Sequence, residues 1–146
     1  MKTFSVPFTS EEIKENITIT TINASKPSHE QQINQALRFQ SEGKISEAAK
    51  YYQSCLKQGS NDHRILCNYG IILRSYGKFK EAEYLQRKAI ELKPDFANAY
   101  INLGNVLQDR GNLEEAEENT RKAIELKPDF TNAYINLGNI LLKRGN

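Results

Sequence analysis

Small and large apolar residues recur along this chain at a fixed interval of 34 positions. Counted from His29, the eighth position of each unit is small, the eleventh is large and apolar, and the twentieth and twenty-seventh are small again. These residues are Ala36, Gly70, Gly104 and Gly138; Phe39, Leu73, Leu107 and Leu141; Ala48, Ala82 and Ala116; and Cys55, Ala89 and Ala123. Small residues at regular points let two helices approach closely, so the pattern predicts stacked helical repeats.

The repeat is clearest in the second half of the chain. Residues 87–112 and 121–146 begin with the same ten residues and share the run Asn-Ala-Tyr-Ile-Asn-Leu-Gly-Asn. Weaker copies precede them, and the four copies begin at His29, His63, Ala97 and Thr131. Such a period is typical of a solenoid, in which each unit packs only against its neighbours.

Glycine and proline divide each copy into two helices. The fifteenth position follows a helical run and is glycine in every copy: Gly43, Gly77, Gly111 and Gly145. A left-handed residue at this point commonly ends a helix. Pro94 and Pro128 end the second helix of their copies, because the residue before proline avoids the α region.

Polar residues mark the predicted helix starts. Ser28 with Gln31 fits a capping pair for the first helix, and Asn112 with Glu115 fits one for the second helix of the third copy. The residues after the prolines, Asp95 and Asp129, are predicted to cap the helices that follow them. Each copy is therefore predicted to be a helix–turn–helix.

This pattern resembles the tetratricopeptide repeat (TPR) family, whose small and large residues fall at the same positions. The resemblance covers residues 29–146 and implies an all-α fold, an antiparallel helix-turn-helix solenoid wound into a right-handed superhelix. It divides the array into a degenerate capping repeat at 29–62, complete repeats at 63–96 and 97–130, and an incomplete repeat at 131–146.

The chain departs from the family pattern at several positions. In the first copy Gln32 stands in place of a large apolar residue and Ser60 in place of proline, as expected of a capping repeat with a polar outer face. The twenty-fourth position, often aromatic in the family, is Tyr52 and then Gln86 and Thr120. We expect looser packing at the last two.

Residues 1–28 carry no repeat. Thr9–Glu12 fits the capping box of a short helix, and Ile17–Ile22 favours a strand that has no partner. We expect a mostly disordered N-terminal tail, the alternative being a strand or helix that folds back onto the first repeat.

The fourth copy stops at Asn146, where its second helix should begin. Its lone helix is rich in apolar residues: Ile135, Leu137, Ile140, Leu141 and Leu142. We expect part of this surface to be uncovered, which favours self-association and indicates the front of a longer protein or a gene cut short. The alternative is that the lone helix is itself the terminal cap.

Composition excludes several classes of function. Lys and Arg total 20 and Asp and Glu total 18, a net charge of +2 that is too balanced to indicate nucleic acid or a membrane surface as partner. The sequence contains neither a membrane-spanning stretch nor a secretory signal, and we expect a cytoplasmic protein. No catalytic constellation, metal site or cofactor motif is present, so we expect a protein that is not an enzyme.

The two cysteines, Cys55 and Cys67, form no metal-binding pair and are predicted to be reduced thiols. Cys55 occupies a small-residue packing position and is expected to be buried and inert. For Cys67 the alternative is a more reactive thiol that faces a groove.

One constellation of polar residues does indicate a function. The sixth position is asparagine in all four copies, and asparagines at the second and ninth positions lie on the same helix face. The set comprises Asn34, Asn68, Asn102, Asn136, Asn105, Asn139, Asn98 and Asn132. Asparagine is a mediocre helix former, so helix propensity does not explain it. An amide both donates and accepts hydrogen bonds, which suits a peptide main chain. The alternative is plain duplication of one copy.

In the TPR family this face lines the concave surface of the superhelix. The asparagine series is similar to that of the repeat domain of the O-linked N-acetylglucosamine transferases, which implies a grip on the main chain of an extended polypeptide. Arg64 and Arg74 are expected to add positive charge to the groove. The residue types of the carboxylate-clamp TPR domains are missing, since Ile33 and Leu37 occupy those places in the first copy.

Three functions remain open at this point. The first is a protein–protein interaction scaffold that binds an extended partner segment. The second is the N-terminal targeting domain of a larger bacterial enzyme, a glycosyltransferase or sulfotransferase, as the resemblance to bacterial TPR arrays implies. The third is a structural element for self-association.

Overall fold

The computed structural model describes residues 26–145, which form seven α-helices and no strand. They are α2 (His29–Ser41), α3 (Ile45–Lys57), α4 (His63–Ser75), α5 (Phe79–Leu92), α6 (Ala97–Asp109), α7 (Leu113–Leu126) and α8 (Thr131–Lys143). The predicted all-α repeat fold is confirmed. The predictions for residues 1–25 lie outside the described residues.

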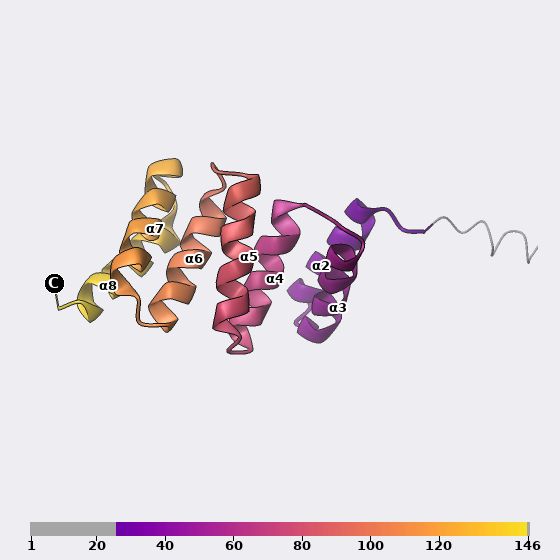
Figure 1. Ribbon diagram of the computed structural model, residues 1–146, viewed down its shortest axis with the longest axis horizontal. Helices are drawn as coiled ribbons and strands as arrows, with labels where there is room; N and C mark the ends of the chain where they lie inside the picture. Colours follow the sequence, from indigo (N-terminus) through magenta and orange to yellow (C-terminus); the bar gives the residue numbers. More distant parts are fainter. Residues whose placement is uncertain (1–25, 146) are drawn as a thin grey trace, which may run out of the picture.

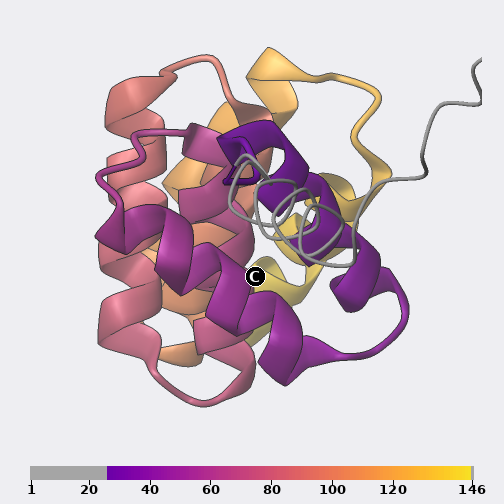
Figure 2. The ribbon, with the colours of Figure 1, turned by 90° about the vertical axis from the view of Figure 1, so that its right-hand side faces the viewer.

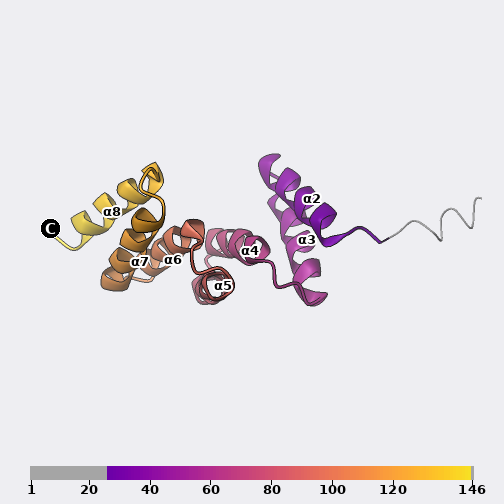
Figure 3. The ribbon, with the colours of Figure 1, turned by 90° about the horizontal axis from the view of Figure 1, so that it is seen from above.

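The first six helices pair in chain order, and the three pairs stand in a row that α8 continues (Figure 1). Seen end-on, α2 and α3 lie in front of the later repeats (Figure 2). Helix α6 contacts α4 and α8 directly, so α4, α6 and α8, the first helices of the last three repeats, form a continuous inner layer. The view from above shows α5 beside α4, with α8 at the opposite end of the row from α2 and α3 (Figure 3).

The turns that follow α2, α4, α6 and α8 confirm the predicted role of glycine in ending these helices. Gly43, Gly77, Gly111 and Gly145 adopt φ values of 76°, 75°, 81° and 80°, in the left-handed region that favours glycine. At the start of the array, the Gln31 N–H donates to Ser28 Oγ, while the Ser28 N–H donates to Gln31 Oε1. Both hydrogen bonds of the predicted capping pair therefore form.

The predicted aspartate caps are wrong. Helices α6 and α8 begin after Phe96 and Phe130, and neither helix has a side-chain cap. The chain instead turns on backbone bonds: the Phe96 N–H donates to the Lys93 carbonyl at 3.1 Å, and the Ala99 N–H to the Phe96 carbonyl at 3.0 Å. The aspartates stand one residue too early to serve as N-caps.

Asn112 does precede α7, but its side chain does not cap the helix backbone. Its amide donates to the Glu115 carboxylate at 3.0 Å instead. Asn112 and Glu115 therefore interact as predicted, but only through their side chains.

The expectation of loose packing at the twenty-fourth position is also wrong. Gln86 and Thr120 are as fully buried as Tyr52. Their partners explain this, since a Cβ on Gly70 would lie 2.5 Å from Gln86 Nε2, and one on Gly104 would lie 2.5 Å from Thr120 Oγ1. The glycine on the first helix of each pair thus leaves room for the side chain of Gln86 or Thr120 on the second helix, and no void remains between the two helices.

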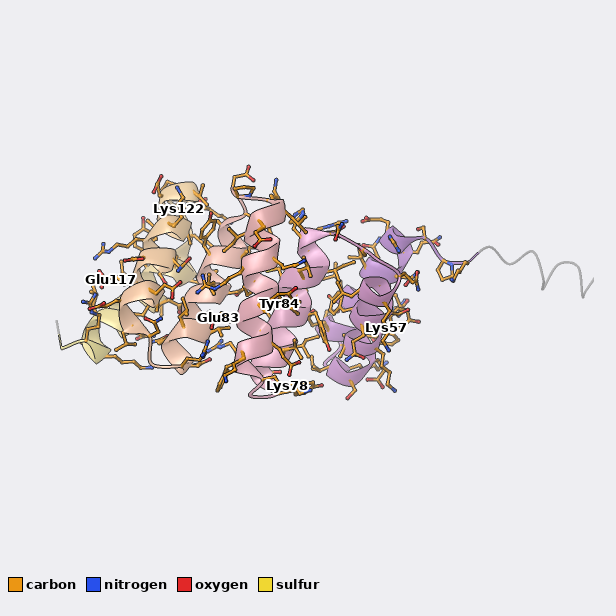
Figure 4. The ribbon with its side chains drawn as sticks, in the orientation of Figure 1. Lys57, Lys78, Glu83, Tyr84, Glu117 and Lys122 are labelled. Carbon is orange, nitrogen blue, oxygen red and sulfur yellow. The ribbon has the colours of Figure 1, made fainter. Side chains whose placement is uncertain are left out.

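Ion pairs join the later repeats on the outer side of the row. Glu83 on α5 accepts hydrogen bonds from Arg87 on its own helix and from Arg110 at the end of α6. The same arrangement recurs 34 positions later at Glu117, Arg121 and Arg144. Glu83 and Glu117 are labelled in Figure 4, on α5 and α7.

The last helix leaves apolar surface uncovered, as expected from its sequence. Ile140 is fully buried, but Ile135 is 57% exposed and Leu142 is 76% exposed. The surface is therefore divided, with one side of α8 packed on the array and the other open.

Candidate functional site

The inner layer of helices carries a cavity of about 290 Å³ that is open to solvent. It lies on the face made by α4, α6 and α8, where these helices touch in turn. Six asparagines line it: Asn68, Asn98, Asn102, Asn105, Asn132 and Asn136. The sequence pattern therefore gathers amides from three separate helices around one hollow.

Helical periodicity explains why these amides converge. On α6, Asn98, Asn102 and Asn105 are spaced by four and three residues and so lie on one face. The opposite face of the same helix carries Leu103 and Leu107, each 1% exposed in the core. Burial of these leucines fixes the rotation of α6 and so directs the asparagines into the cavity.

The amides keep hydrogen-bonding capacity for a ligand. Asn102 donates through Nδ2 to Cys67 Sγ at 3.1 Å, and Asn136 donates through Nδ2 to Asn105 Oδ1 at 2.5 Å. A carboxamide has two N–H donors and an oxygen with two lone pairs, so each of these residues can form further bonds. Asn68, Asn102, Asn105 and Asn136 are each half-buried, and these contacts hold the last three in fixed orientations.

Four of the residues singled out in the sequence do not line this cavity. Asn34 on α2 and Asn139 on α8 are exposed outside it. Arg64 forms ion pairs with Glu30 and Asp62, and Arg74 forms one with Asp109. The hydrogen bond from Arg64 holds the pKa of Glu30 below its usual value. Both guanidinium charges are therefore balanced within the chain.

The cavity also has apolar walls that sequence reasoning did not single out as site residues. They are Cys67, Ile71, Ile101, Phe130 and Ile135. Two of these could have been found from the sequence, since Ile101 and Ile135 immediately precede Asn102 and Asn136 in equivalent copies. The site is therefore an alternation of amide and apolar surface rather than a purely polar strip.

Cys67 lines the cavity but is 2% exposed. Burial raises the pKa of its thiol to about 11, although the hydrogen bond from Asn102 acts in the opposite direction. The thiol is thus protonated at neutral pH, so the predicted higher reactivity of Cys67 is wrong, although this residue does face the groove. Cys55 is fully buried, as expected, and its Sγ donates to Gln32 Oε1.

Within residues 26–145, no group of three or more His, Cys, Asp or Glu side chains could hold a metal ion. Over the same part of the chain, each helix is too short or too polar to cross a membrane.

Comparison with known proteins identifies the repeat. The tetratricopeptide repeat family matches residues 97–130, and a further TPR repeat family matches residues 70–111. A comparison with curated proteins gave no match.

Solved structures share the fold. The first TPR domain of Spaghetti (RPAP3), bound to the HSP90 peptide SRMEEVD, is 22% identical with a TM-score of 0.73; the match covers 79% of this chain and 91% of that one. MamA is 19% identical with a TM-score of 0.76, over 96% of this chain and 87% of that one. An O-GlcNAc transferase of Thermobaculum terrenum is 26% identical with a TM-score of 0.75; the match covers 77% of this chain and only 22% of the transferase.

Proposed function

Because the chain belongs to the tetratricopeptide repeat family, we propose that its inner face binds an extended segment of a partner protein. In this proposal the asparagines of α4, α6 and α8 hold the partner's main chain. We take residues 29–146 as the interaction unit, preceded by residues 1–28, and place it in the cytoplasm, where Cys55 and Cys67 stay reduced.

The observation that carries the proposal is the amide-lined cavity. Three neighbouring helices each contribute one asparagine from the same repeat position: Asn68, Asn102 and Asn136. An extended peptide leaves its N–H and C=O groups without internal partners, and a carboxamide can satisfy both kinds. The Spaghetti TPR domain is a similar fold that binds a peptide, which supports a protein-binding role here.

The charge of the site distinguishes this proposal from capture of an acidic tail. The peptide on the Spaghetti domain, SRMEEVD, carries three acidic residues. No Lys or Arg lines the cavity of this chain, and Arg64 and Arg74 are occupied by carboxylates of their own chain. Main-chain recognition by neutral amides fits this site better than recognition of a carboxylate.

The test is simultaneous replacement of Asn68, Asn102 and Asn136 by alanine. Partners captured by the wild-type protein would be identified, and the affinity of one of them measured by calorimetry. Each lost hydrogen bond should reduce binding by about 0.5–1.5 kcal/mol. Three together should weaken binding by roughly ten- to a thousandfold if the effects add.

The matched control is the double change of Asn34 and Asn139 to alanine. These asparagines occupy equivalent helix faces but lie outside the cavity, so affinity should stay near that of the wild type. Alanine favours helices over asparagine by up to about 0.7 kcal/mol, which should keep both variants folded. Full affinity of a folded triple variant would refute main-chain recognition at this site.

A second candidate function is the targeting domain of a larger enzyme. The similarity to one segment of the Thermobaculum transferase, over 22% of that protein's length, favours it. Sequencing the gene beyond Asn146 tests this, and a stop codon there would refute it.

A third candidate, self-association through the open side of α8, would give a concentration-dependent mass in sedimentation that Leu142→Ser abolishes.

A further inference from the structure

A second surface of the array is basic and shares no residue with the amide-lined cavity. It lies on the first helix pair. An open cavity of about 360 Å³ there is lined by Lys26, Pro27 and Gln32 at the start of α2 and by Lys50, Tyr51 and Ser54 on α3. An adjoining open cavity of about 370 Å³ shares Lys50 and Ser54 with the first and adds Lys57. We call the surface of these two cavities the basic face.

Three lysines and no acid line the basic face. Lys26, Lys50 and Lys57 are exposed, and within residues 26–145 none of them forms an ion pair. The one acid of α3, Glu47, lines neither cavity. The described part of the chain therefore leaves the charge of these lysines unbalanced.

The basic face is particular to the first repeat. Lys57 is labelled on α3 in Figure 4. The residues at the points of α7 equivalent to Lys50 and Lys57 are Glu118 and Glu125. Duplication of one repeat does not explain a charge that changes sign between copies. The lysines stand at the end of the array to which residues 1–25 are attached.

Apolar surface lies between the lysines. The ring of Tyr51 is half-buried, and Pro27 is exposed. Gln32 beneath them is 6% exposed, and its polar atoms are engaged: Nε2 donates to the Pro27 carbonyl at 2.9 Å, and Oε1 accepts from Cys55 Sγ at 3.4 Å. A matching occupant therefore carries acidic groups for the lysines and apolar side chains for the two rings.

Residues 1–25 contain both kinds of group in sequence. Their three acids, Glu11, Glu12 and Glu15, fall within five positions, and three isoleucines follow at Ile17, Ile19 and Ile22. The acids thus form one end of a short stretch and the apolar side chains form the end nearer to α2.

The chain reaches the basic face without a long connection. Lys26 itself lines the first cavity, so the preceding residues are attached at its edge. Lys50 and Lys57 are separated by about 10.5 Å along the axis of α3. The stretch from Glu15 to Lys26 can extend to about 36 Å, which leaves room for the chain to turn back along α3. A short tether gives the attached segment an effective concentration on the order of millimolar, so weak contacts suffice.

We propose that residues 11–22 dock on the basic face of the same molecule. The three acids pair with Lys50 and Lys57, and the isoleucines cover Tyr51 and Pro27. The inner face of the array stays open to a partner, so this docking is independent of main-chain recognition by the asparagines.

The experiment uses the full chain with a spin label at Asn16→Cys. Cys55 and Cys67 are at most 2% exposed, so a thiol reagent labels the introduced cysteine selectively. Paramagnetic broadening of backbone amide signals then reports which helix lies near the segment. Broadening should be strong over Lys50–Lys57 of α3 and absent from α7 and α8.

Reversal of charge tests the contact itself. Lys26→Glu, Lys50→Glu and Lys57→Glu together should abolish the broadening of α3, and so should Glu11→Lys, Glu12→Lys and Glu15→Lys together. All six changes combined should restore it, because the opposite charges are then exchanged. The lysines of the basic face are exposed, so the fold should survive these changes.

The matched control reverses three other lysines outside the basic face, Lys78, Lys88 and Lys143, each to glutamate. They are exposed and form no ion pair within residues 26–145, so the change in net charge is the same. Broadening of α3 should persist in this variant.

Three results would overturn the proposal. Even broadening over all helices, or none, would mean that residues 11–22 have no site on α3. Failure of the combined variant to restore the contact would remove the ionic pairing. Broadening of an unlabelled, isotope-enriched copy mixed with a spin-labelled copy would place the segment on a second molecule.

Discussion

The junction between α3 and α4 is held differently from the junctions between α5 and α6 and between α7 and α8. At the two later junctions a glutamate binds one arginine of its own helix and one from the next repeat, as Glu83 does with Arg87 and Arg110. At the first junction the positions equivalent to these three are Ala49, Gln53 and Tyr76. The ionic contact is thus missing at that place.

Apolar contact takes over at the first junction. Ile65 and Ile72 of α4 lie in one core cluster with Tyr52 of α3, and all three are at most 2% exposed. One inter-repeat ion pair, between Arg64 and Glu30, lies at the exposed edge. The first helix pair is therefore attached mainly by burial, and the later repeats by burial together with a repeated ion-pair network.

The connecting segments differ in the same way. Lys93 and Lys127 leave α5 and α7 at φ −142° and −141°, followed by proline. The first connection instead passes through Gly59 at φ 81°. The connection after the capping repeat therefore has a backbone conformation of its own, and its stability should respond to different changes from those that affect the later repeats.

The largest effect is expected from Ile65→Ala. This side chain of α4 is fully buried against the first helix pair. Its truncation should lower the free energy of unfolding, measured by urea denaturation, by about 2–5 kcal/mol. Hydrogen exchange should show the loss of protection concentrated in α2 and α3. The exposed isoleucine provides the control, since Ile135→Ala should cost far less. A uniform loss of protection through α8 would contradict a separately attached first pair.

A smaller effect is expected from Gly59→Ala. No heavy atom lies within 4 Å of the added Cβ, so the cost comes from the left-handed backbone alone, about 1–2 kcal/mol. Gly138→Ala is the matched control, because that glycine is helical and its Cβ would also meet open space. It should stabilise the protein by about 0.5–1 kcal/mol. Equal effects in thermal melts would mean that the first connection does not depend on its left-handed residue.

The smallest effect on stability is expected from lowering the pH. Burial raises the pKa of Glu83, but hydrogen bonds from Arg87 and Arg110 outweigh it and lower the pKa below its usual value. The Arg121 hydrogen bond lowers the pKa of Glu117 likewise. A carboxylate with a lowered folded-state pKa adds stability above its unfolded pKa and loses it as the pH falls through the folded value. Wild-type melting temperature should therefore fall between about pH 5 and pH 3.

The double change Glu83→Gln and Glu117→Gln should reduce this fall in melting temperature at acid pH, here called the acid limb. It should also lower the melting temperature by a few degrees at neutral pH. Part of the limb should remain, because Glu30 and Asp62 at the first junction also have lowered pKa values from Arg64. Glu118→Gln, an exposed change on α7, is the control. An unchanged acid limb in the double variant would show that the ionic junctions add nothing measurable.

Much of the fold could be predicted because the period, the glycines and the prolines are local signals. The start of α6 could not, since the turn after Pro94 is made by backbone bonds that no side-chain signal reports. Packing at Gln86 was also missed, because it depends on Gly70 across the pair, and a single position does not reveal its partner.

The candidate site was predicted in part for a similar reason. Helical periodicity indicates which face carries Asn102, so the amides were found. It does not indicate how far neighbouring helices close around that face, and so Asn34 and Asn139 were grouped with residues that the structure places in a cavity. The pairing of Arg64 with Glu30 spans 34 positions and has no local signature.

The recurrence of the Glu83 network at Glu117 has a consequence for inheritance. Each glutamate meets an arginine supplied by the next unit at the same register, so a unit of this kind fits after any unit that carries the glutamate. Unequal crossing-over in the gene could add or delete one such unit in frame, and the glutamate and arginine at the new junction would again be in register. The length of the array can therefore change in a single genetic event that keeps the ionic junctions between units.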